Sequence, residues 1–428
     1  MYKVNFSKPI NVHFMGIGGI SMSGLAEILL KAGFKVTGSD MKASEITDQL
    51  ADMGALINIG QCASNITDNI DLVVYTAAIH PDNEEFKAAV EKNIPMLTRA
   101  QLLGQIMENY KYSIAVSGTH GKTTTTSMLS YILIDADTDP TISVGGILDS
   151  IGGNIRVGKS EYFVTEACEY TNSFLSFFPT VDVILNIEED HLDFFKDLED
   201  IKHSFRCFAE RVPVETGTVI ANYDDANTMD ALRGIARKVI TFGLNAKADV
   251  YAQNIVHRGS VSEFDIYHRG NYFARVTLHV PGIHNVRNAL AATAAAIVLG
   301  VSPNAVKYGL AGFEGAGRRF DFKGKFQGAD LYDDYAHHPS ELRALLDAVD
   351  TLNYQRTIVV FQPHTYSRTA KLFNDFVEQL RRPTIVYLAE IYAAREKNTI
   401  GISSADLAAQ IPVSYTHLRA HETSAHLV

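Results

Sequence analysis

The sequence predicts an α/β protein made of three successive domains, and three observations support this prediction. The chain has 428 residues, which is more than one hydrophobic core usually serves. Short apolar runs alternate with stretches of helical periodicity, a pattern typical of parallel sheets. Two glycine-rich turns, at residues 16–21 and 118–124, each follow an apolar run and precede a helical stretch.

The first unit, expected over residues 1–107, has strands predicted at residues 12–15, 35–38 and 72–75 and helices at residues 21–32 and 44–53. Its turn reads Gly16-Ile17-Gly18-Gly19-Ile20-Ser21, and Asp40 ends the next strand. This order is typical of a dinucleotide-binding turn, in which glycines let the backbone approach a diphosphate. Because Ser21 stands where the third glycine belongs, the motif favours a nucleotide diphosphate without specifying NAD.

The second unit, expected over residues 108–317, begins with a phosphate-binding loop. Gly118-Thr119-His120-Gly121-Lys122-Thr123-Thr124 follows the apolar run at residues 114–116 and precedes a helix predicted at residues 128–134. Glycines let N–H groups approach anionic oxygens, Lys122 reaches outer phosphates, and the Thr123 hydroxyl is suited to Mg²⁺. The loop is shorter than the usual P-loop, because Val116 stands at that pattern's first glycine. An ordinary strand-to-helix turn is the alternative interpretation.

Carboxylates and a histidine follow two further strands of this unit, predicted at residues 162–164 and 183–185. Glu166 and Glu169 come after the first strand, and His191 comes after the second. The carboxyl ends of parallel strands share one edge of a sheet, the edge that also carries the phosphate loop. Thr123, Glu166 and His191 are therefore candidate ligands for cations that bridge nucleotide phosphates. Taken singly, each acid would be interpreted as a solvated or capping residue, and it is their joint position at the strand ends that favours a metal site.

The later part of the second unit changes character. Residues 262–268 and 272–280 alternate in period two around Arg269-Gly270-Asn271, which predicts a β-hairpin at the edge of the sheet. An alanine-rich helix is predicted over residues 288–299, with Gly300 and Pro303 ending it.

The third unit is expected over residues 318–412, with strands at residues 331–332, 357–361 and 384–388 and helices starting near Pro339 and Thr369. Its polar clusters cover residues 317–320, 333–339 and 361–368. Two of them follow strands, so we expect them on loops at a ligand-facing edge, where histidine and arginine suit anions and amino acids. For His337 and His338, a helix-start pair without substrate contact is the alternative.

Composition narrows the function classes. The formal net charge of −11 disfavours nucleic acid as a partner. Cys62, Cys168 and Cys207 are widely spaced, so neither a disulfide framework nor a zinc site is indicated, and buried, reduced thiols are expected. No stretch approaches the roughly 18 apolar residues of a membrane span, and the first residues lack a signal-peptide pattern. A cytoplasmic protein without membrane insertion is the simplest expectation.

Together these motifs resemble the Mur ligase family from about residue 11 to about residue 410. The two glycine loops, the His284-Asn285 segment, Arg318-Arg319-Phe320 and the runs at residues 333–339 and 361–368 occur in family order. The resemblance implies an N-terminal Rossmann-like domain, a central P-loop ATPase-like domain with a mixed sheet, and a C-terminal Rossmann-like domain. The last of these would close over ATP bound to the central domain, in a monomer or weak homodimer.

The resemblance further implies ATP-dependent amide-bond formation in peptidoglycan precursor synthesis, with ATP and Mg²⁺ as cofactors. The lactyl carboxylate of UDP-N-acetylmuramate would attack the γ-phosphate of ATP, and the amine of L-alanine would displace phosphate from the acyl phosphate. Three alternatives stay open. They are a recycling ligase that joins a tripeptide to the same sugar nucleotide, an NAD-dependent oxidoreductase, and a nucleotide-binding regulator.

Family roles carry over as expectations. The UDP diphosphate would be held by Gly16, Gly18 and Gly19, with Asp40 near the nucleoside. The ATP site would comprise Gly118, Thr119, His120, Gly121, Lys122, Thr123, Thr124, Asn285, Asn288, Arg319 and Asp334. Within it, Asn285 or Asn288 would face adenine, Asp334 the ribose and Arg319 the transferring phosphate. The metal would be bound by Thr123, Glu166 and His191, with Glu169 as second choice to Glu166.

L-Alanine would be surrounded by Tyr335, His337, His364 and Arg368. The residues expected to act in catalysis are Lys122, His191, Arg319 and His337. Thr365 departs from the family pattern, because many relatives carry arginine there.

The C-terminal residues 413–428 differ from the rest of the chain. Apolar periodicity stops after Pro412, and Ser414 to Thr423 resembles translated sequencing-adapter sequence. We expect a non-native tail, a truncated third domain and therefore weak turnover. A polar, disordered tail is the alternative.

Overall fold

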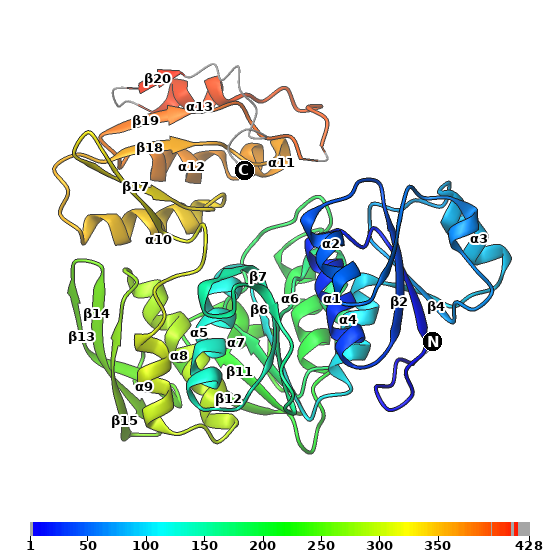
Figure 1. Ribbon diagram of the computed structural model, residues 1–428. Coiled ribbons are helices and arrows are strands. Elements are labelled where there is room, and N and C mark those ends of the chain that lie inside the picture. The colour runs from blue at the N-terminus through cyan, green and yellow to red at the C-terminus, as the bar shows by residue number, and fades with distance from the viewer. Residues whose placement is uncertain (1–2, 395, 412–414, 418–428) are drawn as a thin grey trace.

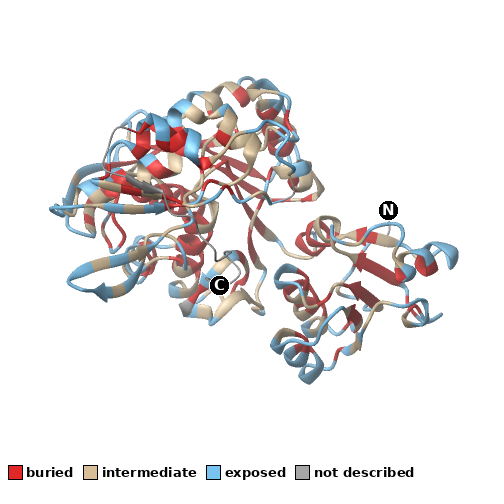
Figure 2. Cartoon of the chain, turned by 90° about the horizontal axis from the view of Figure 1, so that it is seen from above, coloured by how far each residue is buried: buried red, intermediate tan, exposed pale blue. Residues whose placement is uncertain are grey.

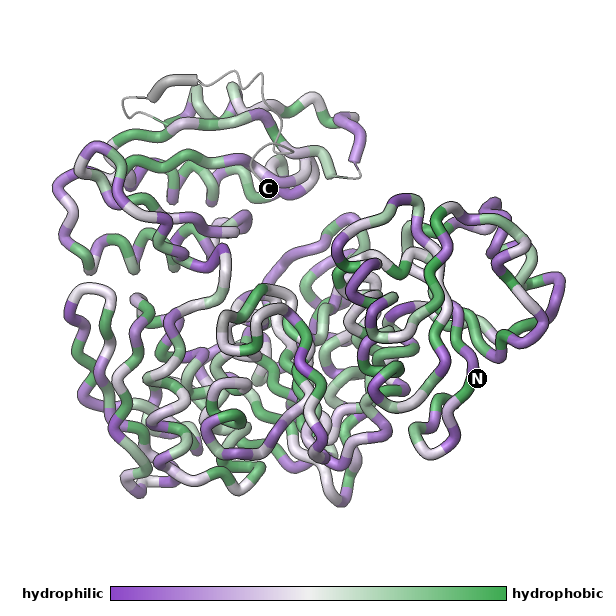
Figure 3. Tube along the Cα trace, viewed as in Figure 1, coloured by the Kyte–Doolittle hydropathy of each residue, from purple (hydrophilic) through white to green (hydrophobic). Residues whose placement is uncertain are grey.

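The computed structural model describes residues 3–394, 396–411 and 415–417, which form three α/β units (Figure 1). The first and central units lie side by side, and the third unit lies above the central one in this view. Figure 3 shows hydrophobic stretches alternating with hydrophilic ones along the trace. In Figure 2, buried strands occupy the interior while exposed residues cover the outer helices and loops. The predicted α/β class is confirmed.

The first unit is a five-stranded parallel sheet in the order β3-β2-β1-β4-β5. Its strands are β1 (Asn11–Met15), β2 (Lys35–Asp40), β3 (Leu56–Ile59), β4 (Leu72–Tyr75) and β5 (Met96–Thr98). Its helices are α1 (Ile20–Lys31), α2 (Glu45–Asp52), α3 (Glu84–Glu91) and α4 (Arg99–Met107), with the short η1 (Ala63–Asn65). Strand order reverses between β1 and β4, and ligands of open parallel sheets bind outside such a point.

The central unit is a ten-stranded mixed sheet in the order β15-β14-β13-β12-β11-β10-β6-β9-β7-β8. Its strands are β6 (Tyr112–Ser117), β7 (Thr141–Leu148), β8 (Gly153–Arg156), β9 (Tyr162–Glu166), β10 (Val181–Ile184), β11 (Thr218–Asn222), β12 (Lys238–Gly243), β13 (Val250–Arg258), β14 (Val261–His268) and β15 (Asn271–Leu278). The strands β13, β12, β11, β10, β6, β9 and β7, adjacent in that order, are parallel, and antiparallel pairs extend both ends of this run. The predicted edge hairpin is therefore confirmed as β14 and β15.

The helices of the central unit cover both faces of this sheet. They are α5 (Lys122–Asp135), α6 (Leu198–Ala209), α7 (Ala226–Ala231), α8 (Ile283–Val298) and α9 (Pro303–Ala311), with η2 (Asp149–Ile151) and η3 (Tyr170–Ser176). Along β6, Ile114 and Val116 enter the core under α5 and α8, whereas Ala115 enters the core under α6. This alternation follows from the two-residue period of a strand. Both α5 and α8 begin five or more residues before the predicted starts, because polar residues fill their first turns.

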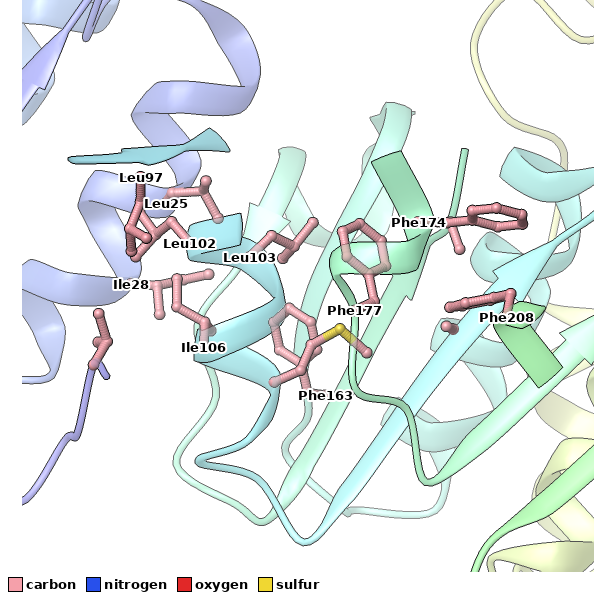
Figure 4. Close-up of a cluster of buried hydrophobic side chains, with 14 of the residues drawn as sticks. Leu25, Ile28, Leu97, Leu102, Leu103, Ile106, Phe163, Phe174, Phe177 and Phe208 are labelled. Atoms are coloured by element: carbon pink, nitrogen blue, oxygen red, sulfur yellow. The ribbon is translucent and has the colours of Figure 1, made fainter. Parts of the chain in front are cut away.

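A shared core joins the first and central units through α4. Figure 4 shows Leu102 and Ile106 of α4 near Leu25 and Ile28 of α1, while Leu103 faces Phe177 of the central unit. Burial of these side chains contributes roughly 25 cal/mol per Å² of apolar surface removed from water. The two units are therefore held together by one continuous hydrophobic core.

The third unit contains a hairpin and a small parallel sheet. The hairpin pairs β16 (Asp321–Phe326) with β17 (Ala329–Asp333), and the sheet has the order β18 (Ile358–Phe361), β19 (Ile385–Leu388), β20 (Tyr415–His417). Its helices are α10 (Pro339–Asp350), α11 (Tyr366–Lys371), α12 (Phe373–Leu380) and α13 (Ser404–Gln410). The strand predicted at residues 331–332 thus belongs to the hairpin, which turns at Gln327 and Gly328, both with positive φ.

Two expectations concern residues outside these sheets. The buried-thiol prediction is wrong, because Cys62 and Cys168 are exposed, although all three cysteines are free. The predicted non-native tail lies largely outside the described residues, of which only residues 415–417 belong to it. Within the described part of the chain, none of the helices combines the length and apolar character needed to cross a bilayer. The domain limits at residues 107, 317 and 412 stay predictions.

Replacing Gly104 of α4 by alanine should loosen the shared core. An added Cβ would lie 1.9 Å from the carbonyl oxygen of Ser176. Relieving such overpacking costs about 1–3 kcal/mol, which exceeds the roughly 1 kcal/mol of helix propensity that alanine gains. Scanning calorimetry should show a melting midpoint lowered by about 2–4 °C per kcal/mol lost. Gly153→Ala is the control, since nothing lies within 4 Å of its added Cβ. Equal midpoints in the two variants would contradict this prediction.

Candidate functional site

The phosphate loop between β6 and α5 depends on two glycines with positive φ. Gly118 has φ +134° and Gly121 has φ +85°, conformations that residues with a side chain rarely adopt. A Cβ on Gly121 would lie 2.7 Å from Oδ1 of Asn288, and one on Gly118 would lie 2.9 Å from the Cβ of Leu185. The loop therefore packs closely against α8 and β10, and it ends at the N-terminus of α5, where anions are favoured.

Lys122, the first residue of α5, is largely buried, at 16% side-chain exposure, and paired. Its Nζ donates to the carbonyl oxygens of Gly118 and Thr119 and lies 3.0 Å from Oε2 of Glu169. Oε1 of Glu169 is also 3.6 Å from Nε2 of His191. Burial alone would lower the pKa of Lys122, but the Glu169 carboxylate outweighs burial and raises this pKa. The structure thus brings together Lys122, Glu169 and His191.

Glu166 points away from this group. One of its carboxylate oxygens accepts a hydrogen bond from the backbone N–H of Gly145 on β7. Thr123 approaches the same strand, since a Cβ on Gly146 would lie 3.1 Å from Cγ2 of Thr123. The predicted trio Thr123, Glu166 and His191 is therefore split between two sides of the loop. The structure favours Glu169 as the partner of His191, and the choice of metal ligand stays a prediction.

A cavity of about 480 Å³ lies beside the phosphate loop, between the central and third units. Eight residues predicted for the ATP site line it, namely His120, Gly121, Thr123, Thr124, Asn285, Asn288, Arg319 and Asp334. The two asparagines lie three apart on α8 and therefore share a helix face. Asn288 donates to Oδ1 of Asn285 at 3.2 Å, and Asn285 donates to the carbonyl oxygen of Pro281 at 2.7 Å.

The cavity also has walls that the sequence analysis missed. Asn222 and Asp224 line it where β11 ends. That strand was not among the predicted ones, so no motif drew attention to the residues after it. The general signal was nevertheless present, because ligands of parallel sheets gather at the carboxyl ends of the strands.

Asp334 and Arg319, which line the cavity from the third unit, contact other residues of that unit. The Asp334 carboxylate accepts hydrogen bonds from the backbone N–H groups of Phe320 at 2.7 Å and Ala336 at 2.8 Å. Burial raises its pKa. The guanidinium of Arg319 lies 5.5 Å from the centre of the Tyr335 ring, and its Nη1 is 3.8 Å from Oε1 of Glu341.

The four residues predicted to surround an amino acid form one cluster. The ring of His337 lies 5.2 Å from that of Tyr335 and 5.6 Å from that of His364, and Nη1 of Arg368 is 3.1 Å from Nδ1 of His364. Tyr392, which the sequence analysis missed, adds its ring 5.4 Å from His364. Burial lowers the pKa of both histidines, that of His364 to about 4 with help from the Arg368 charge.

The segment of residues 188–190, which follows β10, holds the third unit through charged groups. Oδ1 of Asp190 accepts hydrogen bonds from Nε of Arg368 at 3.0 Å and Nη2 at 2.6 Å. Glu188 accepts from the Ser340 hydroxyl, and Glu189 pairs with Lys371 at 3.7 Å. Burial would raise the pKa of Asp190, but Arg368 outweighs it and holds this pKa far below its ordinary value. Arg368 thus serves the domain contact in this arrangement.

The glycine turn of the first unit borders a second cavity, of about 650 Å³. Gly16, Gly19 and Asp40 line it, as predicted for a UDP site. Gly18 is instead turned toward Asp40, whose Oδ2 accepts its N–H at 2.9 Å. Further lining comes from residues that follow β4 and that no motif singled out, among them Thr76, His80 and Asn83.

Three models of known protein families match the three units in the order of the chain. The Mur ligase family catalytic domain matches residues 11–111, the Mur ligase middle domain residues 116–296, and the Mur ligase glutamate ligase domain residues 318–427. The chain belongs to the Mur ligase family. The three-domain fold predicted from the sequence is thereby confirmed.

Individual Mur ligases are similar over nearly the whole chain. The UDP-N-acetylmuramate–L-alanine ligase of Agathobacter rectalis is 56% identical over 95% of this chain and 89% of its own length. The crystal structure of the UDP-N-acetylmuramate-alanine ligase from Thermotoga maritima matches with a TM-score of 0.77 and 29% identity, covering 96% of this chain and 91% of that one. A murein peptide ligase from Psychrobacter arcticus matches with a TM-score of 0.72 and 26% identity over the same shares.

In this Mur ligase, His120 of the phosphate loop lies at the contact between the central and third domains. Its Nε2 is 3.6 Å from Oε2 of Glu188, and its Nδ1 is 3.2 Å from Oε1 of Glu341. Burial alone would lower the pKa of His120, but Glu188 and Glu341 outweigh it and raise the pKa to about 9. His120 was predicted at the ATP phosphates, and the structure places its ring, as an imidazolium, between two domains.

His120, Glu188 and His338 offer three ligand atoms within 4.8 Å of one another. A divalent cation does not fit their present hydrogen bonds. Nδ1 of His338 accepts the backbone N–H of Ser340, and its Nε2 faces the carbonyl oxygen of Glu189 at 3.2 Å, so neither nitrogen has a free lone pair. Burial and the His120 charge lower the pKa of His338 to about 4, which keeps this ring neutral.

The contact between the central and third domains should weaken at alkaline pH. Because the folded state raises the pKa of His120, its stabilising contribution is complete below the ordinary value of 6.5 and is lost as pH rises through about 9. Small-angle X-ray scattering should give a larger radius of gyration above pH 9 than at pH 6.5. His120→Gln should abolish this pH response, and a variant that still expands over the same range would contradict the prediction.

Proposed function

We propose that this Mur ligase joins L-alanine to the lactyl carboxylate of UDP-N-acetylmuramate with hydrolysis of ATP to ADP, in peptidoglycan precursor synthesis. The observation that carries the proposal is 56% identity with the Agathobacter rectalis ligase over 95% of the chain. The site supports it, because a nucleotide cavity and an amino-acid cluster meet at one domain contact.

ATP supplies the phosphoryl group that activates the carboxylate, and Mg²⁺ neutralises charge on the phosphates. The residues present fit both groups. The N–H groups of the glycine loop and Lys122 would hold phosphate, while Thr123, His191 and either Glu169 or Glu166 would supply ligands for metal ions on the two sides of the loop that the structure separates. Lys122 is already charged, so it only has to exchange Glu169 and the loop carbonyls for phosphate oxygens. Arg319 would reach the transferring phosphate from the third domain.

The amino-acid cluster suits an amine nucleophile. Its two histidines have lowered pKa values and are neutral at pH 7. Nδ1 of His337 donates to the carbonyl oxygen of Tyr335, so its Nε2 lone pair can accept a proton or hydrogen bond from the L-alanine ammonium, whereas Nδ1 of His364 accepts from Arg368. Arg368 would bind the carboxylate of L-alanine. Thr365, where many relatives carry arginine, leaves Arg368 as the nearby guanidinium for this role.

Neither alternative enzyme is favoured. A tripeptide-recycling ligase would use the same first domain, but the similar murein peptide ligase from Psychrobacter arcticus is 26% identical, against 56% for the L-alanine ligase of Agathobacter rectalis. An NAD-dependent oxidoreductase would leave the Lys122, Glu169 and His191 group without a use. Cytoplasmic location and a monomeric or weakly dimeric state stay predictions.

The test is a set of parallel reactions that contain ATP, Mg²⁺ and UDP-N-acetylmuramate with L-alanine, L-serine, glycine or tripeptide. ADP release should be fastest with L-alanine and should require the sugar nucleotide. Faster turnover with tripeptide would overturn the substrate assignment. Reduction of NAD without ADP release would overturn the ligase assignment.

Glu169→Gln and Glu166→Gln should separate the two candidate metal ligands. Glu169→Gln removes the charge beside Lys122 and His191, so we expect kcat/KM for Mg·ATP to fall about 100-fold. Glu166→Gln should lose less than about tenfold, since an amide oxygen still accepts the hydrogen bond of Gly145. Steady-state kinetics at varied Mg²⁺ measures both. The opposite ranking would assign the metal to Glu166.

A further inference from the structure

Glu341 contacts three parts of the site, although no sequence motif pointed to it. It is the third residue of α10, and its side chain is 13% exposed. Its Oε1 is 3.2 Å from Nδ1 of His120 and 3.8 Å from Nη1 of Arg319. Its Oε2 accepts the backbone N–H groups of His337 at 2.9 Å and His338 at 3.2 Å. One carboxylate therefore meets the phosphate loop, the arginine expected at the transferring phosphate and the amino-acid cluster.

Helix capping accounts for only half of these contacts. In the capping box of α10, the Glu341 side chain accepts the N–H of the cap residue His338. A neutral glutamine would fill that role equally well. The other oxygen faces His120 and Arg319, which carry positive charge and belong to the two sides of the domain contact. A negative charge at this position is therefore explained by its partners outside the helix.

The ring of His120, whose side chain is 14% exposed, takes its hydrogen bond from the third domain. Its Nε2 lies 3.6 Å from Oε2 of Glu188, beyond hydrogen-bond distance, so among the described residues the ring is hydrogen-bonded through Nδ1 to Glu341. Because Glu341 comes from the third domain, this hold exists only while that domain is in contact with the phosphate loop. His120 and Glu341 both line the nucleotide cavity, so the shape of the cavity depends on their pairing.

We propose that Glu341 is a positioning residue that fixes the phosphate loop, Arg319 and His337 relative to one another when the third domain meets the central domain. The inference rests on the proposed ligase function. Glu341 acts through these neighbours, and the ATP and amino-acid sites become organised in the same step. Loss of its charge should lower turnover without affecting the first domain, where the sugar nucleotide is expected to bind.

Kinetics of Glu341→Gln test this role, with Glu341→Asp as the conservative variant and Glu378→Gln as control. Glu378 is an exposed residue on α12 of the same domain. We expect Glu341→Gln to lower kcat about 100-fold, with the KM for UDP-N-acetylmuramate changed less than about twofold, because glutamine keeps the helix cap. Glu341→Asp should recover part of the lost kcat, and Glu378→Gln should have the same kcat as the protein without substitutions. A kcat for Glu341→Gln within about twofold of the unchanged chain would overturn the proposal.

A second measurement does not depend on turnover. NMR titration of histidine-labelled protein, with His120→Asn for assignment, should give His120 a pKa of about 9 in the unchanged chain. The groups that face this ring are Glu188 and Glu341, with His338 neutral beside it. Glu341→Gln should lower this pKa by about one unit or more, whereas Glu378→Gln should leave it in place.

The two measurements separate the proposals. If no amine supports ADP release, the ligase function fails, while the titration still reports whether Glu341 holds His120. If L-alanine is ligated but Glu341→Gln leaves the His120 titration unchanged, the positioning role is wrong and the ligase function stands. A shifted titration together with a reduced kcat supports both.

Discussion

The charged contact between the segment of residues 188–190 and the third domain is the interaction on which the rest of the site depends. Asp190 binds Arg368 through two nitrogens, and Glu188 binds Ser340. These carboxylates follow β10, the strand beside β6, so they lie next to the phosphate loop. Without this contact the cavity beside the phosphate loop would lose Arg319, Asp334 and Glu341 from its walls.

The contact is stable only while its buried charges stay paired. A paired buried charge gains little net stability over apolar packing, but an unpaired one is strongly unfavourable. Asp190 and Arg368 are nearly buried, at 8% and 10% side-chain exposure, so separation of the domains must hydrate both groups. Ligands that offer replacement charges lower this barrier. The carboxylate of an amino acid is such a ligand for the Arg368 half of the contact, because it carries the same negative charge as Asp190.

Local patterns predicted the fold well because glycine turns and alternating apolar residues act over a few residues. β4 was predicted at its observed limits, and the hairpin of β14 and β15 was found from its turn. The edge strands β3 and β5 were missed, since they are short and only partly buried. The site was predicted less completely. Glu169 and Glu166 differ by three positions, and the sequence does not determine which one turns toward Lys122.

The contact of His120 with Glu341 shows the limit of such reasoning, because 221 residues separate the two. Neither residue type is unusual, and nothing in the intervening sequence indicates that they meet. The pairing arises only from the way the third domain is placed over the central sheet. Through this contact His120 belongs both to the phosphate loop and to the interface between the central and third domains.

The shared core around α4 has a consequence for the size of the substrate. Since α4 packs between α1 and the central sheet, the separation between the cavity at Gly16 and the loop at Lys122 is set by apolar side chains. A sugar nucleotide anchored by its diphosphate must therefore have the right length for its carboxylate to reach the phosphoryl group. The third domain does not enter into this length, so the apolar core bears on the sugar nucleotide and the charged contact with the third domain bears on the amino acid.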